Sequence, residues 1–353
     1  MREPSFWWRA PGIAMHALVP LSVVYGAVAQ AQLRRRGRRV ATPVVCIGNP
    51  TVGGTGKTPT ALTTARILKE MGELPVFLTR GYGGSLAGPV EVDPAHHDAA
   101  QVGDEPLLLA GVARTIVAHA RLAGADTAVA AGASVIVMDD GFQNPSIRKD
   151  FSLLVVDERR GIGNGRVIPA GPLRAPLAAQ LAHAHALLLV GVPLRAGGIA
   201  EEARKRDLPV LRAHMLPDRE FVAALGRGRV LAFAGIGDPE KFFATLADAG
   251  IAVATTRSFP DHHRYTRAEA LALREEADRE GLVLVTTEKD LARLAGDNEA
   301  AELAAHAHAL PVVLAVEEEE TFKSLLLERL ATARRTRNGQ HPPYNSRAGY
   351  LRP

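Results

Sequence analysis

The sequence predicts an α/β fold, in which a mostly parallel sheet carries helices on both faces and a second, smaller α/β domain follows. From residue 40 onward, short and near-continuously apolar runs alternate with helical patterns. This alternation is typical of parallel sheets that are covered on both sides. The 353 residues exceed the usual size of one domain. The candidate strands are also more numerous than one open sheet usually holds, so we expect two sheets.

The candidate elements divide the chain into four parts. We expect an N-terminal segment over residues 1–39, a core domain over 40–215, a second domain over 216–331 and a disordered tail over 332–353, which lacks apolar periodicity. The clearest helical patterns cover 57–71, 239–249 and 267–280. The candidate strands cover 44–47, 75–78, 115–119, 135–138, 153–156, 187–190, 210–213, 230–233, 252–255, 282–286 and 312–315.

Composition excludes several classes of protein. Apolar residues make up 47% and charged residues 23% of the chain, as in ordinary globular proteins and unlike disordered ones. The single cysteine, Cys46, excludes a disulfide framework and a multi-cysteine metal site, and it favours a reducing compartment. The net charge of +4 and the pI near 9.4 suit an anionic substrate or a membrane surface. We expect no nucleic-acid partner, and protein partners stay unknown.

The N-terminal segment indicates contact with a membrane. No Asp, Glu, Lys or Arg lies between Arg9 and Arg34, and a helix over those residues would reach about 36 Å. An aromatic cluster over residues 6–8 precedes this stretch, and a run of arginines over residues 34–39 follows it. Because Pro20 and several polar residues dilute the stretch, a helix lying partly in the membrane is favoured over a true span. A buried helix is the remaining alternative.

A phosphate-binding loop is the strongest local signal. Residues 44–47 form an apolar strand, residues 48–56 are rich in glycine, and Lys57-Thr58 opens a helix. In a P-loop the backbone N–H groups surround phosphate oxygens, the lysine reaches the β- and γ-phosphates, and the hydroxyl of the next residue binds Mg²⁺. The pattern departs from the usual one at Thr51, where glycine is expected. The predicted ATP-binding residues are Thr51, Val52, Gly53, Gly54, Thr55, Gly56, Lys57 and Thr58.

A second strand carries carboxylates toward the same edge of the sheet. Residues 135–138 are apolar, and Asp139 and Asp140 follow directly. Ligands bind at the carboxyl ends of parallel strands, so these residues are candidates for holding Mg²⁺ together with Thr58. The core is therefore predicted to be of the P-loop NTPase type, with ATP and Mg²⁺ as cofactors.

The chain resembles the tetraacyldisaccharide 4′-kinases, the lipid A 4′-kinases of Gram-negative bacteria. The resemblance covers residues 5 to 330, and it depends on a set of short motifs in family order rather than on any one of them. One departure is Ala175, where the family has an acidic residue. The matching motifs are Gly48–Pro59, Arg80-Gly81-Tyr82-Gly83, Gly103-Asp104-Glu105-Pro106, Asp139–Gln143, Gly163–Arg166, Pro169–Arg174, Phe233–Gly237, Phe259–His263 and Thr286–Asp290.

The resemblance implies an activity and its site residues. It implies transfer of the γ-phosphoryl group of ATP to the 4′-hydroxyl of a tetraacylated glucosamine disaccharide 1-phosphate, an anionic glycolipid, at the cytoplasmic face of the inner membrane. Asp104 paired with His262 would accept the proton of the hydroxyl, since an Asp–His pair can share a proton. Glu105 is a further candidate metal ligand. Arg80, Tyr82, Gln143 and Arg174 are candidates for binding the substrate.

Alternatives stay open at this point. His262 could be an ordinary loop histidine, and Glu288-Lys289-Asp290 could be either a site element or the N-terminal cap of a helix. A membrane-recruited ATPase switch of the MinD/ParA type shares the Gly-Gly-x-Gly-Lys-Thr loop. The switch proteins, however, carry a lysine near the start of the loop, and Pro50-Thr51-Val52 has none. A kinase for another small molecule and a nucleotide-binding structural protein are further alternatives.

Overall fold

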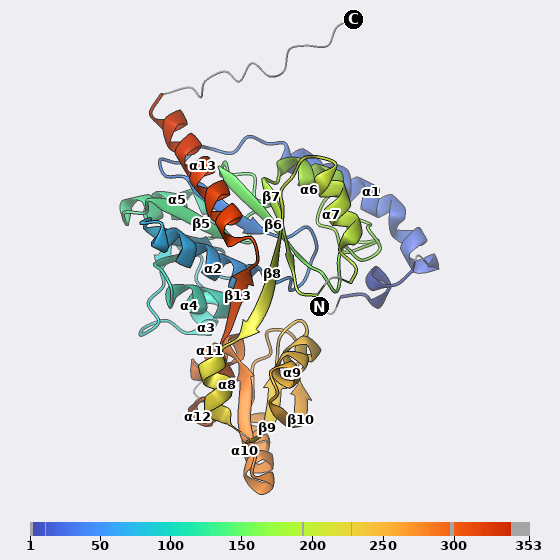
Figure 1. The fold of residues 1–353 in the computed structure, drawn as a ribbon, viewed down its shortest axis with the longest axis vertical. Coiled ribbons are helices and arrows are strands. Elements are labelled where there is room, and N and C mark those ends of the chain that lie inside the picture. Colours follow the sequence, from blue (N-terminus) through green and yellow to red (C-terminus); the bar gives the residue numbers. More distant parts are fainter. Residues whose placement is uncertain (1–2, 11, 193, 227, 297–299, 340–353) are drawn as a thin grey trace, which may run out of the picture.

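The computed structural model describes residues 3–10, 12–192, 194–226, 228–296 and 300–339 (Figure 1). The described chain forms two α/β units, so the predicted fold class is confirmed. The larger unit is built on nine strands in the order β13-β8-β7-β6-β1-β5-β2-β4-β3. Their bounds are β1 Val44–Gly48, β2 Pro75–Thr79, β3 Val90–Glu91, β4 Thr115–Val117, β5 Val135–Asp139, β6 Phe151–Asp157, β7 Ala186–Val190, β8 Val210–Pro217 and β13 Val312–Val316.

Alternation along the buried strands gives this sheet two apolar faces. The strands pair in parallel, except that β3 and β13 run antiparallel to their neighbours. Val45 and Ile47 pack on one face, while Val44 and Cys46 pack on the other. The first face is covered by α2 Lys57–Glu70, α4 Asp104–Ala110 and α13 Glu319–Arg337, and the second by α5 Arg121–Ala130, α6 Leu177–His183 and α7 Gly197–Arg204.

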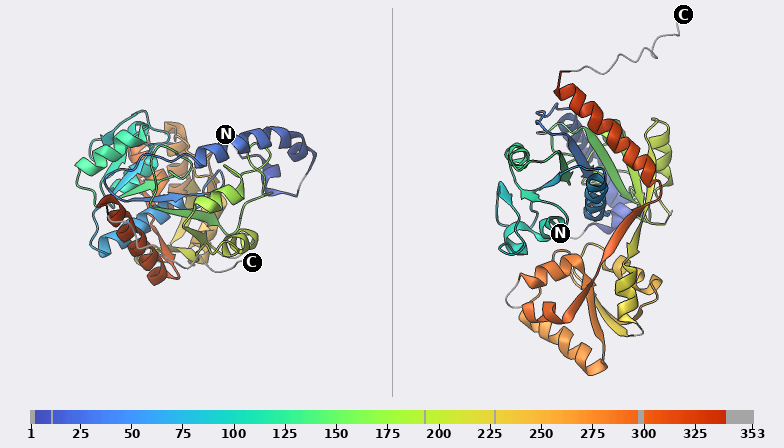
Figure 2. Two further views of the ribbon diagram at one scale, coloured as in Figure 1. Left: turned by 90° about the horizontal axis from the view of Figure 1, so that it is seen from above. Right: turned by 60° about the vertical axis from the view of Figure 1, so that its left-hand side comes forward.

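The smaller unit has a parallel sheet in the order β10-β9-β11-β12. In the right-hand view of Figure 2 the smaller unit lies below the larger one. Helices α10, α11 and α12 pack on one face, and α8 and α9 pack on the other. Its bounds are α8 Arg219–Leu225, β9 Arg229–Ala234, α9 Pro239–Asp248, β10 Ala252–Ser258, α10 Arg267–Glu280, β11 Val283–Thr287, α11 Glu288–Ala295, α12 Ala301–His306 and β12 Ala307–Leu310.

The end of the chain returns to the first sheet, which differs from the predicted division. Strand β13 pairs with β8, and Phe322, Leu326 and Leu330 of α13 are buried in the core of the larger unit. The strand and most of this helix were expected in the second domain. Part of the predicted tail is also wrong, because α13 continues to Arg337, whose guanidinium donates to Asp150 at 2.7 Å. Residues 340–353 of that tail lie outside the described residues.

The N-terminal helix α1 (Ile13–Leu33) lies along one side of the larger unit (Figure 1), and most of its large apolar side chains are exposed. It follows a short 3₁₀ helix, η1 (Ser5–Trp8), and packs against α6. Ser22 is buried and donates to the carbonyl of Val167 at 2.7 Å, and Gly26 lies against Pro176. The large side chains of α1 that stay exposed are Ile13, Leu21, Val23, Val24, Tyr25 and Val28.

This orientation excludes the alternative of a buried helix. Within the described residues, α1 alone is long and apolar enough to cross a membrane. Met15, Ser22 and Gly26 are buried against the protein, while most of the large apolar residues of the helix are left uncovered. Exposed apolar area of this kind marks an interaction surface.

Candidate active site

The phosphate-binding loop lies at the carboxyl edge of the larger sheet, between β1 and α2. The residue before α2 is Gly56, whose φ of 90° is favourable only for glycine. The segment that precedes α6 forms backbone hydrogen bonds with the loop. Val52 donates its N–H to Pro172 at 2.9 Å, and Arg174 donates its N–H to Pro50 at 2.9 Å. Lys57 and Thr58 are thereby fixed at the first turn of α2.

Buried polar atoms without partners gather around this loop. Among the described residues, Asn49 Oδ1, Thr55 Oγ1 and Asp139 Oδ1 are buried and accept or donate no hydrogen bond. Buried polar groups are normally satisfied, so a group of them beside a phosphate loop indicates a place for a polar ligand. Asp139 ends β5 and pairs in register with Ile47 of β1, which brings its carboxylate beside the start of the loop.

Asp139 is the residue best suited to a cation. Burial, followed by the nearby charges of Glu105 and Asp140, raises the pKa of its carboxyl to about 7. A divalent cation would remove this cost, and Mg²⁺ in kinase sites needs only one or two carboxylates besides phosphates and waters. The part of the chain that the structure describes holds no ready cluster of three or more His, Cys, Asp or Glu side chains. The loop and Asp139 therefore fit Mg²⁺ that arrives with a nucleotide.

Asp140 and Arg174 form an ion pair that braces the loop. Arg174 donates through Nη1 to Asp140 Oδ1 at 2.8 Å and through Nε to the carbonyl of Thr51 at 2.9 Å. It also donates to Gln143 at 3.3 Å, and Gln143 in turn donates to the carbonyl of Asn49 at 3.1 Å. Burial alone would raise the pKa of Asp140, but the charges of Lys57 and Arg174 lower it. Arg174 and Gln143 thus contact the loop itself, whereas the sequence suggested contacts with substrate.

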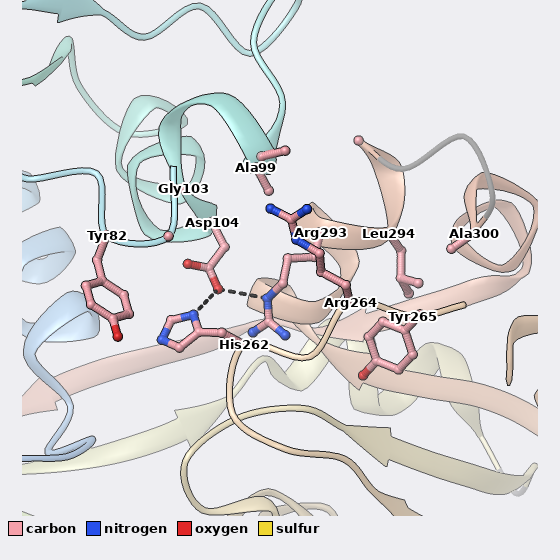
Figure 3. Close-up of a pocket in the computed structure, with 13 residues that line it drawn as sticks. Tyr82, Ala99, Gly103, Asp104, His262, Arg264, Tyr265, Arg293, Leu294 and Ala300 are labelled. Atoms are coloured by element: carbon pink, nitrogen blue, oxygen red, sulfur yellow. Dashed lines mark hydrogen bonds and ion pairs between the residues drawn. The ribbon is translucent and has the colours of Figure 1, made fainter. Parts of the chain in front are cut away.

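The predicted pair of Asp104 and His262 comes together from the two domains (Figure 3). Asp104 is the first residue of α4, and His262 lies in the loop between β10 and α10 with a φ of 56°. Their closest atoms, Asp104 Oδ2 and His262 Nδ1, are 3.3 Å apart. The same oxygen accepts from Arg293 Nε of α11 at 2.8 Å. The ring of Tyr82 lies 5.3 Å from the ring of His262, centroid to centroid.

The two members of the pair shift each other's protonation. The hydrogen bond to Asp104 raises the pKa of His262, although burial opposes it. Burial would raise the pKa of Asp104, but the hydrogen bond to His262 and the charges of Lys289 and Arg293 lower it strongly. When the pair carries one proton, these shifts place it on the imidazole rather than on the carboxylate.

Glu105, the next residue of α4, is paired across the domains with Lys289. The distance from Lys289 Nζ to Glu105 Oε1 is 2.5 Å. Burial would raise the pKa of Glu105, but Lys289, followed by Lys57, lowers it. The carboxylate thus lies within electrostatic reach of the P-loop lysine. Of the remaining predicted residues, Arg80 is exposed and Tyr82 is 68% exposed, and both follow β2 at the same edge of the sheet.

Sequence reasoning missed two residues of this site. Arg293 is 8% exposed in its side chain and connects Asp104 to Asp290 and to the carbonyl of Gly235. Arg121, at the start of α5, is buried, and the charges of Asp139 and Asp140 act on it. Neither residue belongs to a recognisable motif, and each depends on partners that are distant in the chain.

A phosphate loop, an adjacent strand that ends in a carboxylate, and an Asp–His pair at the same edge define a P-loop phosphotransferase. The chain belongs to the tetraacyldisaccharide-1-P 4′-kinase family, whose family model matches residues 14–331. This confirms the resemblance inferred from the ordered motifs.

Individual relatives agree over nearly the whole chain. The tetraacyldisaccharide 4′-kinase of Rhodopseudomonas palustris (strain BisA53) is 54% identical over 334 residues, which cover 95% of this chain and 97% of the relative. That of Nitrobacter hamburgensis is 51% identical over 335 residues, with 95% and 100% covered. Among solved structures, the "apo" form of LpxK from Aquifex aeolicus in complex with ATP superposes with a TM-score of 0.69 at 25% identity, covering 90% of this chain and all of that one.

Proposed function

We propose that the chain is an ATP-dependent kinase of lipid A synthesis. It transfers the γ-phosphoryl group of ATP to the 4′-hydroxyl of tetraacyldisaccharide 1-phosphate, as the names of its family and relatives indicate. The observation that carries the proposal is the juxtaposition, in a chain of this family, of a P-loop with unsatisfied buried polar atoms and the pair of Asp104 and His262.

The loop binds and orients the nucleotide. Its N–H groups and Lys57 would contact the phosphates, and Thr58 and Asp139 would hold Mg²⁺, with Asp140 and Glu105 as further candidate ligands. When bound, Mg²⁺ neutralises charge on the phosphates. Arg174 and Gln143 keep the backbone of the loop in place through Thr51 and Asn49.

Asp104 and His262 handle the proton of the acceptor. The pair must be free of its proton to accept one from the 4′-hydroxyl, and the hydroxyl oxygen then attacks the γ-phosphorus while the bond to the β–γ bridging oxygen breaks. Arg293 and the Tyr82 ring keep the pair in position from two sides. A positioned general base of this kind is worth about 10²–10⁴-fold in rate. Arg80 and Tyr82, at the exposed edge beside the pair, are the candidates for contacting the sugar or its phosphate.

The N-terminal helix connects the site to the lipid. The uncovered apolar face of α1 suits insertion into the cytoplasmic face of the inner membrane, where an acylated substrate resides. The arginines that follow α1, among them Arg34 and Arg39, suit anionic head groups at the same interface.

A radiolabel assay tests the proposal. Purified protein is incubated with Mg²⁺, ATP labelled at the γ-phosphate and tetraacyldisaccharide 1-phosphate, and the extracted lipid is counted. We expect label in the lipid with wild type and none with Lys57→Ala. Hydrolysis of ATP without transfer of label would overturn the proposal and favour an ATPase switch.

A further inference from the structure

Lys289 of α11 forms an ion pair with Glu105, the residue that follows Asp104 of the proposed catalytic pair. It is the second residue of the helix, directly after the turn that Thr287 caps by accepting from the N–H of Asp290. From there its ammonium group reaches Glu105 on α4 of the other domain, at 2.5 Å. The motif that contains Lys289 is therefore both a helix cap and part of the site.

The charges around Lys289 belong to the phosphate site. Burial alone would lower the pKa of Lys289, but the carboxylates of Glu105, Asp104 and Asp139 together raise it. Glu105 is also within reach of the charge of Lys57. Two lysines, one from each domain, thus act on the same carboxylate beside the phosphate loop.

The other carboxylates of the site have different partners. Asp104 is held by His262 and Arg293, and Asp140 is held by Arg174. Within the described residues, Asp139 Oδ1 is buried without a partner. Lys289 is paired with Glu105, the remaining acid of the cluster and itself a candidate metal ligand. A cation that arrives with the nucleotide would compete for Glu105 and release the ammonium group.

We propose that Lys289 is a catalytic residue that leaves Glu105 and binds the γ-phosphoryl group of ATP during transfer. This proposal rests on the proposed function. A phosphoryl group offers several charged oxygens where the carboxylate offers two, and charge-assisted hydrogen bonds to it are among the strong ones. Lys289 keeps its protons throughout. The acceptor oxygen bonds to the γ-phosphorus, the bond to the bridging oxygen of ADP breaks, and the hydroxyl proton passes to the pair of Asp104 and His262.

This arrangement makes the second domain part of the phosphate site. Lys57 serves the phosphates from the core domain, and Lys289 approaches them from the domain that also carries His262. Charge that develops on the transferring oxygens is then stabilised only when both domains surround the nucleotide. Hydrolysis of ATP by the core domain alone is disfavoured for the same reason.

The matched control is Lys241, which also forms an ion pair between the domains. Its Nζ lies 2.6 Å from Asp157 Oδ2, and its side chain is 34% exposed, against 29% for Lys289. The experiment compares Lys289→Ala, Lys289→Arg and Lys241→Ala in the full-length protein. Binding of ATP and of ADP is measured by titration calorimetry with Mg²⁺ and without the lipid, and kcat and KM are measured with Mg²⁺ and the lipid.

We expect Lys289→Ala to weaken ATP binding about tenfold while ADP binding changes less than about twofold, because only ATP carries the γ-phosphate. Its kcat should fall by about 10²–10³-fold, the range for loss of one preorganised donor to a developing charge. Arginine should restore part of the rate. Lys241→Ala should match wild type within about twofold in every measurement.

Equal losses for ATP and ADP, or a kcat no lower than that of Lys241→Ala, would overturn the inference and leave Lys289 as an ordinary ion pair. The calorimetric comparison needs no acceptor. If wild-type protein failed to phosphorylate the lipid while Lys289→Ala still weakened the binding of ATP and not that of ADP, the proposed function would fail and the inference about Lys289 would stand.

Discussion

Replacing Asp104 by Asn removes the charge that unites the proposed catalytic pair and keeps the size of the side chain. Oδ2 of Asp104 serves both His262 at 3.3 Å and Arg293 at 2.8 Å, and the side chain is 3% exposed. A hydrogen bond to a charged group contributes about 1.5–3 kcal/mol. Asparagine can still accept from Arg293, so we expect the folded protein to lose stability by an amount in this range and to stay folded.

The kinetic effect is expected to be larger than the effect on stability. Asp104→Asn and His262→Gln should each lower kcat by about 10²–10⁴-fold, the usual worth of a positioned base. The KM for ATP should change little, because neither residue belongs to the phosphate loop. If the two residues act as a unit, the double variant should be no more than about tenfold slower than the slower single variant, whereas independent effects would multiply.

The pH dependence of kcat tests whether Asp104 raises the pKa of His262. Because Asp104 raises the pKa of His262, protonation of the pair should reduce the rate as the pH falls through that raised pKa. In Asp104→Asn the stabilising charge is gone and burial opposes the imidazolium, so the remaining acid limb should move to lower pH. The assay is kcat against pH, with the radiolabelled lipid as readout.

Three results would refute this reasoning about Asp104 and His262. A near-silent His262→Gln would remove the histidine from the chemistry. Losses that simply multiply would make the two residues independent. An acid limb that does not move in Asp104→Asn would assign the titration to another group. Thermal unfolding of each variant serves as the control that a lost rate is not a lost fold.

Three further predictions concern the loop, the membrane and acid stability. Lys57→Ala should abolish turnover with an unchanged melting temperature, since a loop lysine contributes little to stability; normal turnover would contradict the P-loop assignment. Leu21→Glu combined with Val24→Glu should lower binding to anionic vesicles more than tenfold, because each apolar side chain is worth about 1.5–3 kcal/mol when buried. In that sedimentation assay Leu327→Glu, at an exposed position of α13, is the control that should bind like wild type. Burial lowers the pKa of His185 to about 4, so the free energy of unfolding should fall as the pH decreases from about 6.5 to about 4, by up to about 3 kcal/mol. In denaturant titrations His185→Gln should lose this dependence, and equal slopes for both proteins would contradict the prediction.

The sequence predicts the elements whose pattern is local. The strands that line the phosphate loop are apolar on both faces, and 57–71 and 267–280 have the periodicity and caps of helices, so each is found within a residue or two. Strand β3 has two residues, and β12 reads Ala-His-Ala-Leu beside a helical stretch, so neither has a pattern of its own. Both were missed.

The return of the chain end to the first sheet could not be predicted, because it depends on distant partners. Nothing local distinguishes β13 from the strands of the second domain, and its place is decided by pairing with β8. Arg337 belongs to a run of charged residues that resembles a tail. It is ordered because Asp150 and the carbonyls of Val40 and Thr42 accept its hydrogen bonds.

The residues of the site also divide into those that belong to a local motif and those that depend on distant partners. The P-loop, Asp139, and the pair of Asp104 and His262 were found because short motifs carry them. Arg293 was not, since its contact with Asp104 joins residues 189 positions apart. The roles of Asp104 and His262 stay predictions that the variants above test, and the roles of the metal candidates stay predictions.

The position of the new phosphate on the lipid is the most direct measurement of the activity. Wild-type protein is incubated with Mg²⁺, ATP and tetraacyldisaccharide 1-phosphate, and the product is examined by proton–phosphorus correlation NMR. We expect a second phosphomonoester whose phosphorus correlates with the proton on carbon 4′, and no such signal when Lys57→Ala replaces wild type. A phosphate on any other carbon, or an unmodified lipid beside consumed ATP, would contradict the assignment of this chain as the 4′-kinase.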